Sequence, residues 1–337
     1  MTMHNMKQWV AQQISCPEKQ ALPILSFPCV QLLDVSVKEL TSDSTLQAKG
    51  MSAIADRVAA GAAVSFMDLS VEAECFGSAI RILDGEVPTV VGAIISTPEE
   101  ADDLVIPEIG AGRTGLYIDT IKKAVQLITD RPVFAGMIGP FSLAGRLMDV
   151  SEAMIYCYDV QEMVHTVMEK VTRFLIDYCR AYKTAGANGV MIAEPLAGLL
   201  SPGLAQEFAH PYVKQIIDAV QDDNFAVIYH NCGDNAALMV KDIYSLGAAG
   251  YHFGDAIDLA SVLSEAPKDV LILGNVSPSR QFCNGTPETI TAETHRIMAA
   301  CSGYPNFVIS SGCDIPPLSP WENIDAFFAA ATSFYRL

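Results

Sequence analysis

Residues 226–234 read AVIYHNCGD, and this stretch decides the fold that we predict. Its first part, Ala226 to His230, is a short apolar run of the kind found in parallel strands that are buried on both faces. Its second part, with Asn, Gly and Asp, is typical of a loop. We therefore predict a buried strand over 226–230 that presents polar side chains at its carboxyl end.

Comparable apolar runs recur along the whole chain. They lie at Pro23–Phe27, Ala63–Met67, Val133–Ile138, Gly189–Ala193, Gly250–Phe253, Val270–Gly274 and Phe307–Ser310. Apolar residues at helical spacing separate most of them, as over Val160–Thr184. Strands that alternate with helices indicate a parallel sheet, and eight such units predict an α/β (β/α)₈ TIM barrel. A doubly wound sheet is the alternative, but no GxGxxG follows the first strand.

The chain shows no Gly/Ser-rich linker, repeat or charge block, so we predict one barrel domain over residues 1–337. A helical extension is expected over about residues 1–20. The interval after the second strand is too long for one crossover, and we predict an insertion over about residues 77–130. It contains alternating residues around the turn signal Asp84-Gly85, which favours a hairpin. Insertions after barrel strands lie on the carboxyl face, where this one would wall the site.

Composition excludes several classes of protein. Hydrophobic residues make up 50% of the chain and the net charge is −18, so the protein can bury a large core and repels nucleic acid and anionic lipid. No apolar stretch is long enough for a membrane span, and the N-terminus lacks the apolar core of a secretory signal. We expect a cytoplasmic protein. The nine cysteines are an odd number spread along a long chain, which favours reduced thiols or metal ligands over a disulfide framework.

Barrel enzymes build their sites at the carboxyl ends of strands, where this chain places an imidazole and two thiols. Side chains alternate along extended backbone, so His230 and Cys232 point the same way and can coordinate one ion. Cys313, at the end of the last strand, can reach across the rim as a third ligand. Such a set suits Zn²⁺ and leaves a fourth position open. Packing cysteines with a chance H-x-C spacing are the alternative.

Other strand ends carry carboxylates and a second histidine. Glu194 is a candidate fourth ligand or hydrogen-bond acceptor, and Asp68 occupies a similar position; capping of a turn is the alternative for both. His252 and Asp255 follow another strand and are candidates for orienting a ligand, although a buried structural histidine is common. We assign catalytic roles to Glu194, Asp68 and Asp255.

At these residues the sequence resembles the uroporphyrinogen decarboxylase superfamily, and within it the methylcobamide:coenzyme M methyltransferase branch. The resemblance covers nearly the whole chain. It is carried by SFMDLSVEAE at 65–74, GPFSLA at 139–144, GNVSP at 274–278 and the H-x-C and distant C of His230, Cys232 and Cys313.

The resemblance implies a zinc-dependent methyltransferase. A zinc-bound thiolate, such as that of coenzyme M, would take the methyl group from a methylated corrinoid (methylcobamide) held by a separate corrinoid protein. In this reading Asn275, Ser277 and His252 contact the cofactor. Zinc lowers the pKa of a bound thiol, which agrees with the ligand set. The small thiol acceptor and the oligomeric state are left open.

The chain also departs from the decarboxylase branch. That branch holds its porphyrinogen carboxylates with arginines near the first strand, where residues 23–29 of this chain contain none. The methyltransferases often carry an acidic residue near the end of the sixth strand, where this chain has Gly254 and Asp255. The alternatives kept open are a metal-independent decarboxylase and a non-catalytic binding protein of a corrinoid system.

Overall fold

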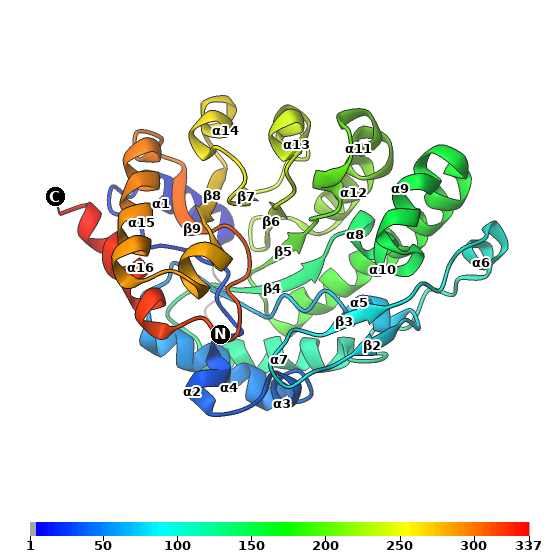
Figure 1. The fold of residues 1–337 in the computed structure, drawn as a ribbon, viewed down its shortest axis with the longest axis horizontal. Coiled ribbons are helices and arrows are strands. Elements are labelled where there is room, and N and C mark those ends of the chain that lie inside the picture. The colour runs from blue at the N-terminus through cyan, green and yellow to red at the C-terminus, as the bar shows by residue number, and fades with distance from the viewer. Residues whose placement is uncertain (1–4, 337) are drawn as a thin grey trace.

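A computed structural model describes residues 5–336, and its centre is a curled parallel sheet of seven strands. The strand order is β1-β4-β5-β6-β7-β8-β9, and every pairing in this sheet is parallel. The strands are β1 (Ala63–Val64), β4 (Val133–Ile138), β5 (Gly189–Ala193), β6 (Ala226–Asn231), β7 (Gly250–Phe253), β8 (Leu271–Val276) and β9 (Phe307–Ser311). Helices surround the sheet (Figure 1). The predicted α/β barrel fold is confirmed.

Helices fill the connections between the strands. They are α1 (Met6–Ser15), α2 (Cys29–Leu33), α3 (Val37–Leu40), α4 (Ser44–Arg57), α5 (Val71–Cys75), α6 (Pro98–Asp103), α7 (Thr114–Leu127), α8 (Pro140–Met148), α9 (Val150–Asp159), α10 (Gln161–Ala185), α11 (Pro202–Phe208), α12 (His210–Val220), α13 (Val240–Tyr244), α14 (Leu259–Glu265), α15 (Pro287–Cys301) and α16 (Trp321–Phe334). Shorter helical turns are η1 (Ala197–Leu199), η2 (Ala236–Met239) and η3 (Pro278–Cys283).

Helix α10 illustrates how the sequence pattern forms a helix. Apolar residues at helical spacing, from Met163 to Tyr182, are buried along one side. The helix ends where Gly186 adopts the left-handed conformation, with φ 103°, that terminates many helices. None of the helices within residues 5–336 is long and apolar enough to cross a bilayer.

The first predicted strand, Pro23–Phe27, is wrong, because these residues form no regular ladder with β1 or β9. The segment nevertheless lies between those two strands. The Leu22 N–H donates to the Ile309 carbonyl at 3.0 Å, and the Gly61 N–H donates to the Ala21 carbonyl at 2.9 Å. The next polar groups pair with side chains of β9: the Ile24 N–H donates to Ser311 Oγ at 3.0 Å. Serine hydroxyls thus replace backbone partners, and an irregular segment closes the barrel.

Alternation along the strands separates two apolar cores. On β6, Ala226 and Ile228 face the barrel interior, whereas Val227 and Tyr229 pack outward under the helices. Leu271 and Leu273 of β8 likewise belong to the interior core. His230 continues the inward-facing series after Ala226 and Ile228, since side chains two residues apart share a face.

Helix α1 closes the amino end of the barrel. Asn5 caps it by accepting from the Gln8 N–H at 2.8 Å, and its buried residues Met6, Trp9 and Val10 join the interior core. The Trp9 ring packs on Phe134 of β4 with centroids 5.8 Å apart. The helix lies within the predicted extension over about residues 1–20, of which residues 1–4 lie outside the described chain.

A hairpin follows β1 in the predicted insertion over about residues 77–130. Strands β2 (Ala79–Arg81) and β3 (Thr89–Val91) pair antiparallel around Asp84-Gly85. The hairpin and α6 extend the molecule on the side away from α15 and α16 (Figure 1). The Asp84 carbonyl accepts from the Val37 N–H at 2.7 Å, which ties the hairpin to α3. Helix α7, by contrast, packs against α4 and β4.

We expect Trp9→Ala to lower the free energy of unfolding by about 3 kcal/mol, because it leaves a cavity under the barrel. The measurement is urea-induced unfolding of the full chain. The matched control is Leu127→Ala on α7, where the side chain is exposed and the change should stay within about 0.5 kcal/mol. Equal effects of the two substitutions would contradict the role of α1 as a structural plug.

Candidate metal centre

Three predicted ligands meet at the carboxyl end of the barrel. His230 ends β6 on the inward face, Cys232 follows two residues later, and Cys313 follows β9. The Cys313 Sγ lies 3.5 Å from His230 Nε2 and 4.0 Å from Cys232 Sγ. One ligand atom from each residue lies within 4.8 Å of the others. Two segments that are 81 residues apart in sequence therefore converge on one point.

The donor set and its spacing fit a tetrahedral zinc ion. With Zn–S bonds of about 2.3 Å and Zn–N bonds of about 2.0–2.1 Å, two sulfurs lie about 3.8 Å apart and sulfur and nitrogen about 3.6 Å apart. The separations in the protein are 4.0 Å and 3.5 Å. Two of the three separations therefore match a tetrahedral site, and three protein ligands would leave one coordination position for another molecule.

Two glycines allow the loops around these ligands to pack closely. A Cβ on Gly254, after β7, would lie 2.6 Å from the Cys232 Cα, and one on Gly312 would lie 2.8 Å from the Asp255 nitrogen. Any larger residue at either place would push the loops after β6, β7 and β9 apart. Glycine at both positions is therefore a packing requirement of the centre.

The two thiols of the centre differ in pKa. Cys313 Sγ lies within hydrogen-bonding distance of both Cys232 Sγ and His230 Nε2, so its single proton can be donated to either. The bond to Cys232 lowers the pKa of Cys232, although burial and nearby acids such as Asp255 oppose the shift. The same bond, together with burial, raises the pKa of Cys313 to about 12. The first proton therefore leaves the pair more easily than the second. A bound cation would displace the second proton, as expected of thiolate ligands.

His252 lies beneath the centre rather than at the barrel mouth. It is fully buried, and its ring nitrogens contact His230 Nδ1 at 2.7 Å and Ser310 Oγ at 2.8 Å. Burial lowers the pKa of His252 well below its usual value, so the ring is neutral. Both nitrogens are used by the protein, and the cofactor contact expected for His252 stays a prediction without a free ring atom to make it.

Asn275 and Ser277 also use their polar groups within the protein. The Asn275 Nδ2 donates to the carbonyls of Gly254 at 2.9 Å and Ile257 at 2.7 Å, which holds the loop after β7. Ser277 is buried and caps η3, where its hydroxyl accepts from the Arg280 N–H at 3.3 Å. These contacts are structural, and the predicted contact of both residues with a corrinoid stays a prediction.

Glu194, at the end of β5, caps helix α8. Its two carboxylate oxygens accept from the Phe141 N–H at 3.0 Å and the Ser142 N–H at 2.6 Å, at the positive end of the helix dipole. Burial raises the pKa of Glu194 to about 7, although these hydrogen bonds act in the opposite direction. The carboxylate is not among the three clustered ligands. Its catalytic role stays a prediction.

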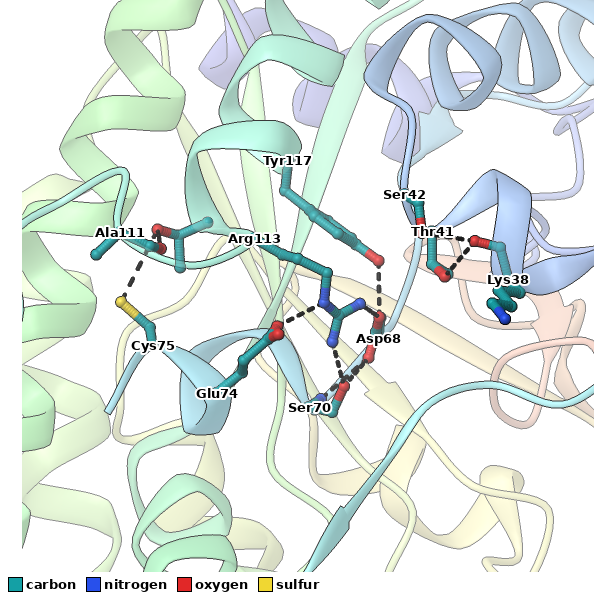
Figure 2. A network of polar contacts seen from close by, with 11 residues as sticks. Lys38, Thr41, Ser42, Asp68, Ser70, Glu74, Cys75, Ala111, Arg113 and Tyr117 are labelled. Carbon is teal, nitrogen blue, oxygen red and sulfur yellow. Dashed lines mark hydrogen bonds and ion pairs between the residues drawn. The ribbon is translucent and has the colours of Figure 1, made fainter. Parts of the chain in front are cut away.

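Asp68, just beyond β1, sits in a saturated polar network (Figure 2). One oxygen accepts from the Ser70 backbone and hydroxyl, and the other accepts from Arg113 and from the Tyr117 hydroxyl at 2.8 Å. Arg113 also contacts Glu74 on α5. The Asp68 side chain has no exposed surface. The contacts give the carboxylate a structural function, and its predicted catalytic role is untested by them.

Asp255 is the predicted acid that stays near solvent beside the thiols. Its carboxylate pairs with Arg280 at 3.2 Å and is about one-third exposed. Its negative charge opposes the lowering of the Cys232 pKa. Among the three predicted catalytic acids, Asp255 is therefore the one with access to a molecule at the barrel mouth.

The sequence profile of the Uroporphyrinogen decarboxylase (URO-D) family matches residues 18–334. The chain belongs to the URO-D family. The resemblance inferred from the sequence motifs is thereby confirmed.

Relatives within the URO-D family carry two kinds of name. The chain is 26% identical over 273 residues to the methylcobamide:CoM methyltransferase MtbA of Methanosarcina acetivorans, which covers 79% of this chain and 78% of the relative. It is also 27% identical over 267 residues to the uroporphyrinogen decarboxylase of Chlorobaculum parvum, with 74% of each chain covered.

Solved structures agree on the fold. A methyltransferase from Methanosarcina mazei superimposes with a TM-score of 0.86, 23% identity and 98% of each chain covered. A B12-independent methionine synthase from Shewanella sp. W3-18-1 superimposes with a TM-score of 0.65 at 10% identity, covering 95% of this chain and 96% of the other.

Several polar residues of this URO-D family member escaped the sequence interpretation. Arg113 and Tyr117 lie in the predicted insertion, and no spacing rule connects them with Asp68. Ser310 was visible only as part of the Ser310-Ser311 doublet at the end of a strand. Asp314 follows Cys313 directly, and its Oδ1 is buried without a hydrogen-bond partner. The sequence places Asp314 at the end of the last strand beside a predicted ligand, but it indicates no role for this acid.

Glu72 on α5 was also missed, although it is a fully buried acid. One oxygen accepts from the Ile138 N–H at 3.2 Å, and the other has no hydrogen-bond partner. Burial raises the pKa of Glu72 to about 8. Between its ordinary pKa of 4.5 and about 8, the folded state binds more protons than the unfolded state. The free energy of unfolding therefore falls as the pH rises through this window.

We expect Glu72→Gln to remove that dependence on pH. The stability of the variant relative to the wild type should rise by roughly 2–4 kcal/mol between pH 5 and pH 9, since one pKa unit is worth about 1.4 kcal/mol. The measurement is urea-induced unfolding across this range. Parallel curves for the two proteins would contradict the assignment of Glu72 as a buried acid with a raised pKa.

Proposed function

We propose that this protein transfers a methyl group from a methylated corrinoid, carried by a separate protein, to a small thiol such as coenzyme M. The observation that carries the proposal is the cluster of His230, Cys232 and Cys313 at the carboxyl end of the barrel. Relatives named methylcobamide:CoM methyltransferase support it. Two thiols and an imidazole have no evident use in a decarboxylation that needs no metal.

The three residues would hold Zn²⁺, and their chemistry matches the task. When bound, zinc would lower the pKa of the acceptor thiol and keep its sulfur anionic and nucleophilic at neutral pH. Cys232 and Cys313 would each contribute one negative charge and His230 none, so the ligands balance the charge of the ion. Because they offset the positive charge, the acceptor sulfur would keep its electron density.

The surroundings of the centre support a large methyl donor. Exposed leucines lie on loops that follow three strands: Leu199 after β5, Leu238 after β6 and Leu318 after β9. The loops that carry Leu238 and Leu318 also carry Cys232 and Cys313. Isolated exposed leucines are ordinary, but three around one barrel mouth suit a protein-bound donor. The segment from Gly77 to Pro107, with exposed Leu83 and Val91, would extend this rim.

A uroporphyrinogen decarboxylase activity is the second candidate, because relatives of similar identity bear that name. The sequence disfavours it, since residues 23–29 supply no arginine for the substrate carboxylates. Asp68 is also paired with Arg113 rather than free to meet a pyrrole.

The deciding experiment combines elemental analysis with an assay of methylcobalamin demethylation against a panel of thiols. We expect about one zinc per chain and thiol-dependent transfer. A zinc-free protein from metal-replete cells that decarboxylates uroporphyrinogen would overturn the proposal. A protein that binds zinc and corrinoid but transfers no methyl group would indicate a binding protein instead.

We expect Cys313→Ala to lose most of its bound zinc and to lower the rate of methylcobalamin demethylation by at least about 100-fold, because a thiolate ligand is removed. The measurements are metal content and the rate with the preferred thiol. The matched control is Cys75→Ala, a partly exposed free thiol on α5, which should retain zinc and activity. Retention of stoichiometric zinc by Cys313→Ala would contradict the ligand assignment.

We expect Leu238→Asp to impair the use of a protein-bound methylcorrinoid, raising its KM about fivefold to tenfold, because a charge replaces an apolar contact. The rate with free methylcobalamin should not change. The control is Leu127→Asp, an exposed leucine at the end of α7 that precedes β4. Equal loss with the free and the protein-bound donor would count against docking at this rim.

A further inference from the structure

A chain of hydrogen bonds leads from the proposed metal centre to the backbone of the segment that closes the barrel. His230 Nδ1 lies 2.7 Å from His252 Nδ1, and His252 Nε2 lies 2.8 Å from Ser310 Oγ. The Ser310 hydroxyl in turn donates to the Leu22 carbonyl at 2.7 Å. All three side chains are buried, at 2% exposure or less. The proposed reaction does not use this series of hydrogen bonds directly.

The Leu22 carbonyl fixes the donor–acceptor direction of every hydrogen bond in this series, because a carbonyl oxygen only accepts hydrogen bonds. Ser310 must therefore spend its single proton on Leu22, and its oxygen must accept from the His252 Nε2–H. A neutral imidazole carries one N–H, so His252 Nδ1 is left as an acceptor. The proton between the two histidines then belongs to His230 Nδ1.

The tautomer of His230 determines which form of its Nε2 faces the thiols. With its proton on Nδ1, His230 presents an unprotonated Nε2 to Cys313 Sγ, 3.5 Å away. This is the tautomer that binds a cation through Nε2. The opposite arrangement would direct an N–H at the ion. It would also require a second proton on His252, which is fully buried and has only His230 and Ser310 as side-chain hydrogen-bond partners.

We propose that His252 and Ser310 are positioning residues that fix the tautomer and orientation of His230 for cation binding through Nε2. The proposal rests on the proposed function insofar as the cation is zinc. Metal-bound histidines commonly donate their other N–H to a carboxylate or carbonyl. Here a second histidine and a serine carry that interaction to a backbone carbonyl.

The irregular segment at residues 21–27 makes this arrangement possible. In a regular ladder, the Leu22 carbonyl would accept from a neighbouring strand. Here the Leu22 N–H pairs with the Ile309 carbonyl, while the Leu22 carbonyl accepts from Ser310. The neighbouring Ser311 hydroxyl also contacts this segment, where it accepts from the Ile24 N–H at 3.0 Å, but no hydrogen bond joins it to His252.

The two serines offer a matched test by zinc competition with a chromophoric chelator. Ser310→Ala should raise the Kd for zinc about 10-fold, whereas Ser311→Ala should stay within about twofold of the wild type. Both variants lose one buried hydroxyl bonded to the same segment, so general loosening of the barrel would affect them equally. Equal zinc affinities for the two variants would overturn the proposal.

Substitutions of His252 separate the hydrogen bond from packing. His252→Leu and His252→Asn are similar in size, but only asparagine keeps an acceptor near the position of Nδ1. We expect His252→Leu to raise the Kd for zinc about 10-fold to 100-fold and His252→Asn to restore most of the affinity. Circular dichroism and urea unfolding of both variants identify any that fail to fold. Equal affinity in two folded variants would argue against the role of His252.

A spectroscopic measurement on zinc-free protein tests the tautomer without any metal. With ¹⁵N-labelled histidine in the full chain, long-range ¹H–¹⁵N correlation should place the His230 proton on Nδ1 in the wild type. The Ser310→Ala variant should show a mixture of tautomers. A proton on Nε2 in the wild type would overturn the inference. If the wild type binds no zinc, the proposed function fails, yet this measurement still decides the inference.

Discussion

The register between β6 and β7 is the constraint on which the candidate metal centre depends. His230 and His252 are directly paired across these two parallel strands, so their side chains leave the sheet on the same face at the same height. Their rings meet edge to face with centroids 4.6 Å apart. A shift of either strand by one residue would turn one imidazole outward, under the helices. The position of His230 toward Cys313 thus follows from backbone pairing.

The second element of the centre is the seam where the barrel closes. In a regular eighth strand, the backbone carbonyls would accept hydrogen bonds from the neighbouring strand. The Ser310 hydroxyl would then lack a carbonyl acceptor. The segment that replaces it exchanges some backbone bonds for bonds to Ser310 and Ser311. A buried polar group needs a partner, and at this seam the partners are two side chains of β9, of which Ser310 also bonds His252. Closure of the fold and orientation of His230 are therefore connected through the same few atoms.

Each buried acid of this strongly acidic chain is stabilised in a different way. Asp68 is neutralised by Arg113 and two hydroxyls, and Glu194 sits at the positive end of α8. Glu72 has one backbone donor and holds its proton, with a pKa raised to about 8. Acids that are paired or protonated add little negative charge to the barrel, whereas the thiols and Asp255 gather near its mouth.

Much of the architecture was determined by the sequence alone. Apolar runs with helical patterns between them identified all seven strands of the sheet, because a buried parallel strand excludes polar residues from both faces. Of the eight strands predicted, only the first was wrong. Asp84-Gly85 identified the hairpin, and two-residue alternation placed His230 and Cys232 on one face. Only the tertiary structure decided the rest. Arg113 reaches Asp68 across 45 residues, and Ser310 bonds a carbonyl 288 residues away. Neither contact has a local pattern, since a hydrogen bond depends on proximity in space, which sequence separation does not encode.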